Sequence, residues 1–232
     1  MKLLVKRLLH RAMDGYVQAR LLDIDTQRNM IAAAATARFI ERNAPSAVSL
    51  HDRNEVLRYA AGLVRNQQGL VCEFGVFRGA SINVLAECLP DRPVYGFDSF
   101  EGLPSVWRTG FQRGSFNLEG GLPDVRKNVQ LVKGWFSDTL PEFLAQHQGD
   151  VALVHIDCDL YGSAKTVLDT IGARIRRGSV LVFDEYFNYP GWQKHEHKAF
   201  REFARSGSRK YDYVAYNAAH QQMVVKCTRS SQ

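Results

Sequence analysis

Acidic residues directly follow two apolar segments of this 232-residue sequence. Asp157 and Asp159 follow segment 151–156, and Asp184 and Glu185 follow segment 179–183. If both segments are neighbouring parallel strands, their carboxyl ends meet at the edge of the sheet where open α/β sheets bind ligands. Four carboxylates packed together repel one another unless something positive joins them. A hard divalent cation with oxygen ligands is the natural candidate, although two of the acids could instead cap the following helices and face water.

A glycine motif forms a second group of candidate residues, Glu73-Phe-Gly75-Val-Phe-Arg-Gly79-Ala-Ser81. Glycines let the backbone turn tightly and approach a ligand just before a helix begins. The GxxxG spacing differs from the GxGxxG fingerprint, which disfavours an NAD-dependent oxidoreductase. Small residues beside the carboxylate of Glu73 suit a cationic sulfonium with an amino-acid tail, although a plain tight turn would use the same glycines.

Asp98 ends the next apolar segment of the chain. An acidic side chain at the tip of the second strand is placed to accept hydrogen bonds from both ribose hydroxyls of a nucleoside. A turn or capping aspartate is the alternative. We expect Asp98, with Ser99 beside it, to bind the ribose.

Two aromatic residues, Trp135 and Phe136, follow the third apolar segment, 128–132. They could wall an adenine ring, and core packing explains them equally well. Ser137 or Asp138 could bond the base or cap the next helix.

His195-Glu196-His197 has the composition of a metal cluster but the wrong spacing. On a helix, residues two apart point away from each other, and ligand pairs favour spacings of three or four. Arg78 and Lys165 either anchor a charged substrate or lie at the surface.

Short apolar segments alternate with helical ones from Gly69 onward, and these elements must position the candidate residues. We expect strands at 70–74, 93–97, 128–132, 151–156 and 179–183, and helices near 80–89, 137–146, 162–176 and 195–205. Such alternation is typical of parallel βαβ units. Segments 211–216 and 221–227 are joined by a short link that suits an antiparallel hairpin. The sequence thus predicts a Rossmann-like α/β fold with a seven-stranded, mostly parallel sheet.

The residues ahead of this sheet are expected to be helical. Segment 1–45 places apolar residues on one side of a basic face, namely Leu3, Leu4, Leu8, Leu9, Ala12 and Met13. Asp52 can cap a second helix that runs to about Val64. We therefore expect an N-terminal helical cover, 1–68, and a ligand-binding domain, 69–232.

Segment 99–125 contains several glycines and two prolines and is too long for a usual strand-to-helix connection, which suggests a lid. Together with the N-terminal helix it would cover the substrate. The apolar face of that helix would also support a homodimer.

Composition excludes several classes of protein. The net charge is +6, but Lys and Arg are scattered, so we expect no nucleic acid partner. No apolar run approaches the roughly 20 residues of a membrane span, and Lys6 and Arg7 interrupt the N-terminal apolar run, so we expect a cytoplasmic protein without membrane association. The four cysteines form no CxxC pair and are expected to be inert thiols.

Several stretches together resemble the macrocin O-methyltransferase family, a branch of the class I S-adenosylmethionine-dependent methyltransferases. They are EFGVFRGAS (73–81), VYGFDSFEGLP (94–104), KGWFSDTLP (133–141), HIDCDLYGS (155–163) and VFDEYFNYPGW (182–192). They occur in family order and spacing across about residues 70–200. The predicted sheet with its terminal hairpin is also the layout of class I methyltransferases.

The resemblance implies S-adenosylmethionine as cofactor and Mg²⁺ held by Asp157, Asp184 and Glu185. Such enzymes commonly have two aspartates after the fifth strand, where this chain has Asp184-Glu185 with its longer glutamate. The residues expected to contact the cofactor are Glu73, Gly75, Gly79, Ser81, Asp98, Ser99, Trp135, Phe136, Ser137 and Asp157.

The expected function is methyl transfer to a hydroxyl of a small molecule, either a sugar or a natural product. The metal would lower the pKa of that hydroxyl, and Asp157 or Asp159 would take its proton. Two alternatives are a methyltransferase-like cofactor-binding protein without catalysis and an N-methyltransferase acting on a small amine. Retention of all four strand-end carboxylates argues against loss of catalysis.

Overall fold

The computed structural model describes residues 6, 13–15, 17–206 and 209–229. The strands are β1 (Val48–Leu50), β2 (Leu70–Phe74), β3 (Val94–Asp98), β4 (Val129–Lys133), β5 (Val151–Ile156), β6 (Ile175–Phe183), β7 (Lys210–Asn217) and β8 (Met223–Arg229). The helices are α2 (Ile24–Asn43), α3 (Arg53–Val64), α4 (Ala80–Cys88), α5 (Phe136–Gln146), α6 (Tyr161–Ile171) and α7 (Glu196–Ser206), with short 3-10 helices at Gly172–Arg174 and Trp192–Lys194.

The eight strands found among the described residues form one mixed sheet in the order β1-β7-β8-β6-β5-β2-β3-β4. Strands β2 to β6 are parallel to one another, and β8 is antiparallel to both β6 and β7. This confirms the Rossmann-like α/β fold with its terminal antiparallel hairpin.

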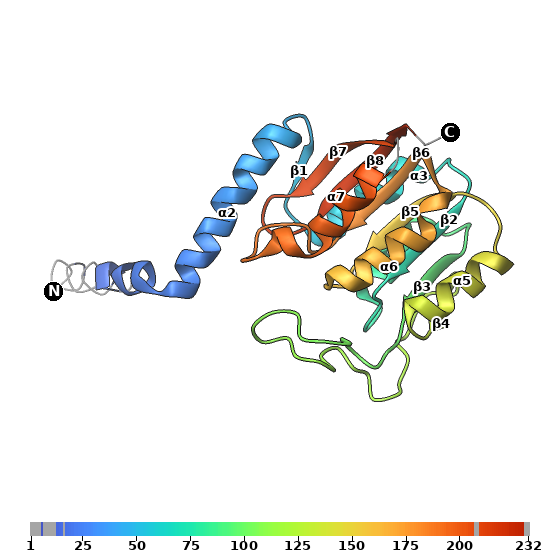
Figure 1. Cartoon of the computed structure of the whole chain (residues 1–232), viewed down its shortest axis with the longest axis horizontal. Helices are drawn as coiled ribbons and strands as arrows, with labels where there is room; N and C mark the ends of the chain where they lie inside the picture. The colour runs from blue at the N-terminus through green and yellow to red at the C-terminus, as the bar shows by residue number, and fades with distance from the viewer. Residues whose placement is uncertain (1–5, 7–12, 16, 207–208, 230–232) are drawn as a thin grey trace.

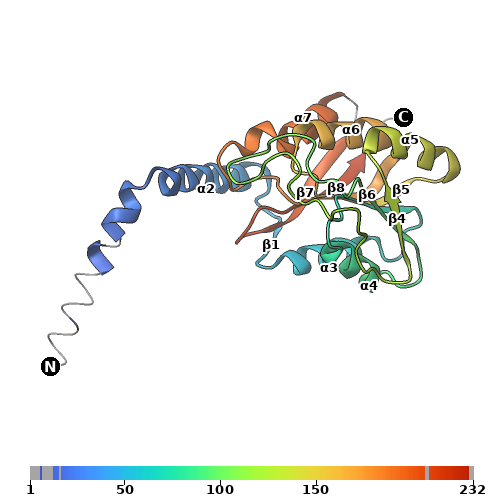
Figure 2. The same cartoon turned by 90° about the horizontal axis from the view of Figure 1, so that it is seen from below.

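Helices cover both faces of the sheet. Figure 2 shows α5, α6 and α7 on one side and α3 and α4 on the other. On the first side, Leu140, Val167 and Phe200 pack with sheet residues in one hydrophobic cluster. On the other side, Leu57 and Leu85 belong to a second cluster. The middle of the sheet is therefore buried on both faces, which explains why β2, β5 and the end of β6 are nearly continuous apolar runs in the sequence.

The structure adds an eighth strand to the seven that were expected. β1 has three residues and pairs in parallel with β7, with Val48 opposite Ala215. None of its residues is fully buried, so it lacks the apolar run that identifies the other strands. Segment 1–68 is consequently not only helical: it contributes β1 to the sheet and α3 to one of its covering layers.

Helix α3 follows the sequence prediction closely. Asp52 caps it by accepting hydrogen bonds from Asn54 N and Glu55 N at 2.8 and 3.1 Å. The expected buried face is also observed, with Val56, Leu57, Ala60, Ala61 and Val64 all inaccessible to solvent or nearly so. The cap fixes the start of the helix and thereby the position of its first residue, Arg53.

Helix α2 is attached by its carboxyl-terminal half and points away from the sheet (Figure 1). Phe39 packs edge-on against Trp192 and Tyr213, and Thr36 Oγ1 accepts a hydrogen bond from Asn188 N at 2.9 Å. The apolar residues expected on the first helical segment, Leu3, Leu4, Leu8, Leu9 and Ala12, lie outside the described residues. Within the described part of the chain, none of the helices has the length and apolar character needed to cross a membrane.

The four cysteines are unpaired. Cys72, Cys158 and Cys227 are buried, as their positions in or beside strands predicted. Burial raises the pKa of the Cys72 thiol to about 12, so it remains an uncharged core residue.

Candidate active site

A cavity of about 490 Å³ opens at the carboxyl ends of β2, β3, β5 and β6. The predicted site residues that line it are Gly75, Ser81, Asp98, Ser99, Trp135, Phe136, Asp157, Asp159, Asp184 and Glu185. These predicted residues, which follow several different strands, therefore lie around one cavity. Glu73, Gly79 and Ser137 do not line it.

The glycine loop after β2 forms the floor of one end of this cavity. Gly75 has φ +95°, and a Cβ built on it would lie 1.7 Å from the carbonyl oxygen of Asp157. Only glycine fits between the two loops. Gly79 has φ +80° and is the N-cap residue of α4. It ends the loop at the start of that helix and does not line the cavity.

Asp98 holds this loop in place through backbone hydrogen bonds. Its Oδ2 accepts from Val76 N and Phe77 N, both at 2.8 Å, and its Oδ1 accepts from Phe100 N at 2.8 Å. A carboxylate offers about four lone-pair sites, so one site on Oδ1 accepts no hydrogen bond from a described residue, and Asp98 lines the cavity. The turn-forming interpretation of Asp98 is therefore observed, and it is compatible with a ligand on the remaining site. Ser99 lies beside it and is buried.

Glu73 lies beneath the loop, contrary to the expectation that its carboxylate faces the ligand. It is fully buried, Ser81 Oγ donates to its Oε1 at 2.9 Å, and His155 Nδ1 bonds its Oε2 at 2.8 Å. Both oxygens are thus already engaged within the protein. Its side chain lies on the face of the sheet that α4 covers, where Ser81 is, because alternate residues of a strand face opposite sides.

The two aromatic residues after β4 differ in their surroundings, one lining the cavity and the other also packing in the core. Trp135 lines the cavity with 38% of its surface exposed. Phe136 also lines the cavity, but it packs edge-on against Phe74 at 5.4 Å. Ser137 is exposed in an adjoining hollow, where its hydroxyl donates to Asp138 Oδ1 at 2.8 Å. Ser137 consequently has no contact with the main cavity.

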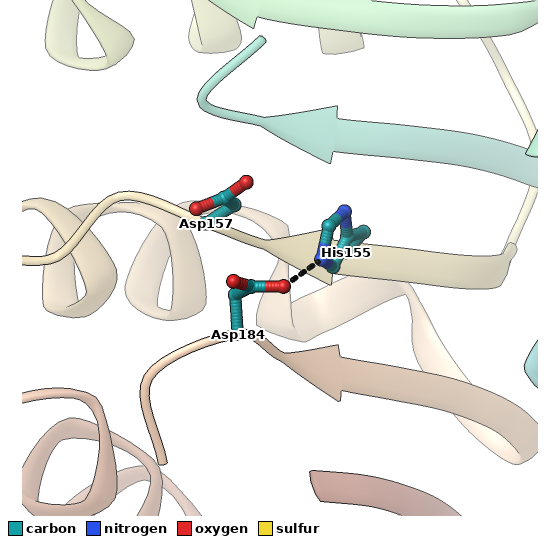
Figure 3. A group of neighbouring side chains, drawn as sticks. All are labelled: His155, Asp157 and Asp184. Atoms are coloured by element: carbon teal, nitrogen blue, oxygen red, sulfur yellow. Dashed lines mark hydrogen bonds and ion pairs between the residues drawn. The ribbon is translucent and has the colours of Figure 1, made fainter. Parts of the chain in front are cut away.

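At the other end of the cavity, Asp157 and Asp184 lie side by side. The register of β5 and β6 places Ile156 opposite Phe183, so the next residue of each strand is an aspartate (Figure 3). Together with His155 they form a group whose potential ligand atoms all lie within 4.8 Å of one another. Oxygen ligands of this kind suit a hard divalent cation.

Three donors surround Asp184. Its Oδ1 accepts from Arg53 Nε at 2.7 Å and bonds His155 Nε2 at 3.3 Å, and its Oδ2 accepts from Gln222 Nε2 at 3.2 Å. Arg53 also donates through Nη2 to Asp157 Oδ2. None of Arg53, His155 and Gln222 was predicted from the sequence as a site residue.

These charges shift the titration of the whole group. Burial lowers the pKa of His155, but its bonds to Asp184 and Glu73 outweigh burial and raise that pKa to about 10. Burial raises the pKa of Asp184, yet His155 and Arg53 hold it well below its usual range. Burial and the neighbouring Asp184 raise the pKa of Asp157 to about 7. Burial and Asp157 raise the pKa of Asp159 to about 8.

Glu185 lies in the cavity wall but outside the group of close ligand atoms. Its Oε2 is buried and has no hydrogen-bond partner, while its backbone N–H donates to Glu196 Oε2 at 3.1 Å. An unpartnered buried carboxylate oxygen is costly, and a cation bound beside it would satisfy it. The carboxylates at this end of the cavity therefore fit a divalent ion. Asp157 and Asp184 would be its ligands, and Glu185 lies further from these two residues.

Within His195-Glu196-His197, the side chains of Glu196 and His197 are engaged in separate contacts inside the protein. Glu196 is fully buried and accepts from the backbone of Cys158 and Glu185. His197 lies within an aromatic cage, with ring centroids 5.3 Å from Phe39, 4.8 Å from Tyr186 and 4.7 Å from Trp192.

The long loop 99–125 forms the outer wall of the cavity. It has a small core of its own, in which Leu103 and Trp107 pack with Leu160. The guanidinium of Arg108 stacks over Trp107 at 3.8 Å and over Tyr189 at 4.8 Å. This loop thus presents aromatic and apolar surface with one cation to whatever lies in the cavity.

The fold and the position of this cavity define the class of the protein, a Rossmann-like methyltransferase fold. The calicheamicin methyltransferase CalS11 has this fold with a TM-score of 0.62, at 24% identity, covering 87% of this chain and 91% of that one. The O-methyltransferase NovP matches with a TM-score of 0.59 and 22% identity, covering 76% of this chain and 80% of that one.

Within this class, the model of the macrocin O-methyltransferase (TylF) family matches residues 44–206, and the chain belongs to this family. Demethyldecarbamoylnovobiocin O-methyltransferase of Streptomyces niveus is 28% identical over 148 residues, 54% of this chain and 55% of that protein. Mycinamicin III 3''-O-methyltransferase of Micromonospora griseorubida is 27% identical over 143 residues, 51% of this chain and 55% of that protein. The chain thus spans about half the length of the curated relatives it matches.

Proposed function

We propose that this protein transfers the methyl group of S-adenosylmethionine to a hydroxyl of a sugar or of another natural product. One observation carries the proposal: a single cavity joins the glycine loop with Asp98 to the carboxylates of Asp157, Asp159 and Asp184. The first half suits a nucleoside with a sulfonium group, and the second suits activation of a hydroxyl. Curated relatives whose names describe 3''-O- and 4'-O-methylation support the acceptor class.

The reaction itself forms one bond and breaks another. The acceptor oxygen attacks the methyl carbon in line with the departing sulfur, an O–CH₃ bond forms, the S–CH₃ bond breaks, and S-adenosylhomocysteine leaves. The hydroxyl proton needs an acceptor. We assign this role to Asp159, since its carboxylate lines the cavity and accepts no hydrogen bond from a described residue, whereas Arg53 holds Asp157.

The backbone of Asp159 supports this assignment. Its φ of +61° is unusual for a residue other than glycine, and such strain is retained where the surrounding structure imposes it, often at active sites. A divalent cation held by Asp157 and Asp184, with Glu185 in the wall of the same cavity, would act as a Lewis acid on the hydroxyl.

The loop 99–125 supplies the acceptor side of the cavity. Trp107, Arg108 and Phe111 line this side, and the guanidinium of Arg108 is held by stacking against both rings and against Tyr189. Such a surface suits one face of a pyranose ring or of an aromatic aglycone. A cytoplasmic homodimer in which α2 forms the contact between subunits completes the proposal.

Mass-labelled methyl transfer tests the function. The wild type would be incubated with S-(¹³C-methyl)adenosylmethionine and a panel of glycosylated macrolides, aminocoumarins and matched amines, and the products located by NMR. A labelled O–CH₃ group is the expected result. Label on nitrogen would favour the N-methyltransferase. Cofactor binding without transfer to any acceptor would favour the non-catalytic binding protein.

A further inference from the structure

Arg53 occupies the space between the two carboxylates that are closest to the proposed metal position. It is the first residue of α3, and its guanidinium bonds Asp184 Oδ1 through Nε at 2.7 Å and Asp157 Oδ2 through Nη2. A guanidinium in this position already neutralises part of the charge that a divalent cation would neutralise. The two cations therefore compete for the same oxygens.

The hydrogen bonds of Asp184 show which donor can give way. His155 and Gln222 are fully buried, and both are tied into further contacts: His155 to Glu73, and Gln222 to Asn217 at 2.7 Å. The Arg53 side chain is 37% exposed. Moving a buried imidazole or amide off its partner would leave an unpaired polar group, whereas the Arg53 guanidinium can exchange its carboxylates for water.

We propose that Arg53 is a displaceable internal cation, which holds Asp157 and Asp184 together before a divalent ion binds and turns toward solvent when that ion binds. The inference rests on the metal included in the proposed function. Without Arg53, two neighbouring carboxylates would repel each other and the site would spread. With it, the site is preformed, but the incoming ion must replace two ion pairs, so Arg53 lowers metal affinity.

Calorimetric titration of Mg²⁺ into the full-length protein saturated with S-adenosylhomocysteine tests this competition. Arg53→Met removes the charge and keeps most of the stem. We expect it to bind Mg²⁺ at least about tenfold more tightly than the wild type. Arg58→Met is the matched control, because Arg58 is an exposed arginine of the same helix, and we expect wild-type affinity.

The outcomes separate this inference from the proposed function. Mg²⁺ affinity that is unchanged or weaker in Arg53→Met, with normal binding by the wild type, overturns the displacement alone. Absence of Mg²⁺ binding in all three proteins, with S-adenosylhomocysteine still bound, overturns the metal site and the displacement with it.

A second measurement uses the wild type and does not depend on the folding of Arg53→Met. The Nε–H of Arg53 should give a ¹⁵N-NMR signal that exchanges slowly with water in metal-free protein, and Arg53→Lys assigns it by loss of the signal. Addition of saturating Mg²⁺ should shift this signal and accelerate its exchange. An unchanged signal at saturation would overturn the displacement.

Discussion

We propose two tasks for the carboxylate of Asp98. Three of its lone-pair sites fix the backbone of the glycine loop and of its own turn, and the fourth is left for a ligand in the cavity that Asp98 lines. Charge-assisted hydrogen bonds of this kind are the stronger ones in proteins. A ligand bound at the remaining site would therefore meet a loop that is already ordered.

Replacing this residue should affect both tasks. We expect Asp98→Ala to weaken binding of S-adenosylhomocysteine by about 1–3 kcal/mol and also to lower stability, because a hydrogen bond to a charged group has this magnitude. Calorimetry and thermal unfolding measure the two effects. Ser99→Ala is the control next to it and should change affinity less. Cofactor affinity in Asp98→Ala equal to that of the wild type would remove Asp98 from the cofactor site.

His197 makes stability depend on pH. Burial, followed by the charges of Arg201 and Arg205, lowers the pKa of His197 to about 4, and Tyr186 and Trp192 enclose its ring. The unfolded chain has the ordinary pKa of about 6.5 and binds the proton more readily. The stability that neutral His197 provides is thus fully present above about pH 6.5 and is lost as the pH falls toward 4.

Urea unfolding at pH 7 and pH 5 measures this dependence. Between these values the wild type should lose about 2 kcal/mol more stability than His197→Phe, which keeps a ring in the cage but cannot take up a proton. His51→Gln changes an exposed histidine and serves as the control. Its free energy of unfolding should fall by as much as that of the wild type between the two pH values. Equal losses in the wild type and His197→Phe would show that this ring does not control the acid sensitivity.

At the scale of elements, the sequence pattern located the seven longer strands, most clearly where both faces are buried. The start of β6 was predicted wrongly, because it begins at Ile175, inside the segment 162–176 that was expected to be helical. β1 escaped prediction because its three residues are partly exposed and its partner β7 is distant in sequence. Arg53 was not predicted for the same reason. In the sequence it is a polar residue at the start of a helix, far from Asp184. The pairing of β1 with β7 and the packing of α3 bring the two residues together. His155 was not predicted as a site residue because it lies inside a strand rather than at its end. The burial of Glu73 was not predicted because residue spacing alone does not show which face of the sheet its side chain occupies.

The loop 99–125 was predicted from its length, and its behaviour as a lid remains a prediction. Trypsin cleavage at Arg113, an exposed position of this loop, should slow severalfold when S-adenosylhomocysteine and an acceptor are added. The closed loop would be held by Trp107 against Leu160.

Trp107→Ala removes this anchor and should be cleaved at a similar rate with and without ligands. Phe39→Ala is the control, because Phe39 does not line the cavity. It shows whether loss of an aromatic side chain elsewhere in the fold also makes the loop easier to cleave. Wild-type cleavage that is equally fast in both conditions would contradict a lid.

For the whole molecule, α2 is the prominent feature outside the domain (Figures 1 and 2). Ile24 and Ile31, seven residues apart on this helix, are 71% and 69% exposed. Exposed apolar side chains in one row are typical of a surface covered by a partner, and here we propose a second copy of the chain.

Sedimentation equilibrium should therefore give twice the chain mass of 26.2 kDa. The double variant Ile24→Glu/Ile31→Glu should sediment as a monomer, since it places charge on the contact. Asn29→Glu/Ala37→Glu adds the same charge to another side of α2 and should remain dimeric. A wild type that is monomeric at micromolar concentration would contradict the dimer.

The metal-assisted transfer of a methyl group to oxygen is tested most directly by turnover after exhaustive chelation, with an acceptor identified from the panel. Activity should fall about 100-fold or more and return when Mg²⁺ is restored, because Lewis-acid assistance contributes several kcal/mol. Asp157→Asn should stay inactive with Mg²⁺ present. Full activity of the wild type in excess chelator would contradict the metal, leaving Asp157, Asp159 and Asp184 as proton acceptor and hydrogen-bond acceptors for the substrate.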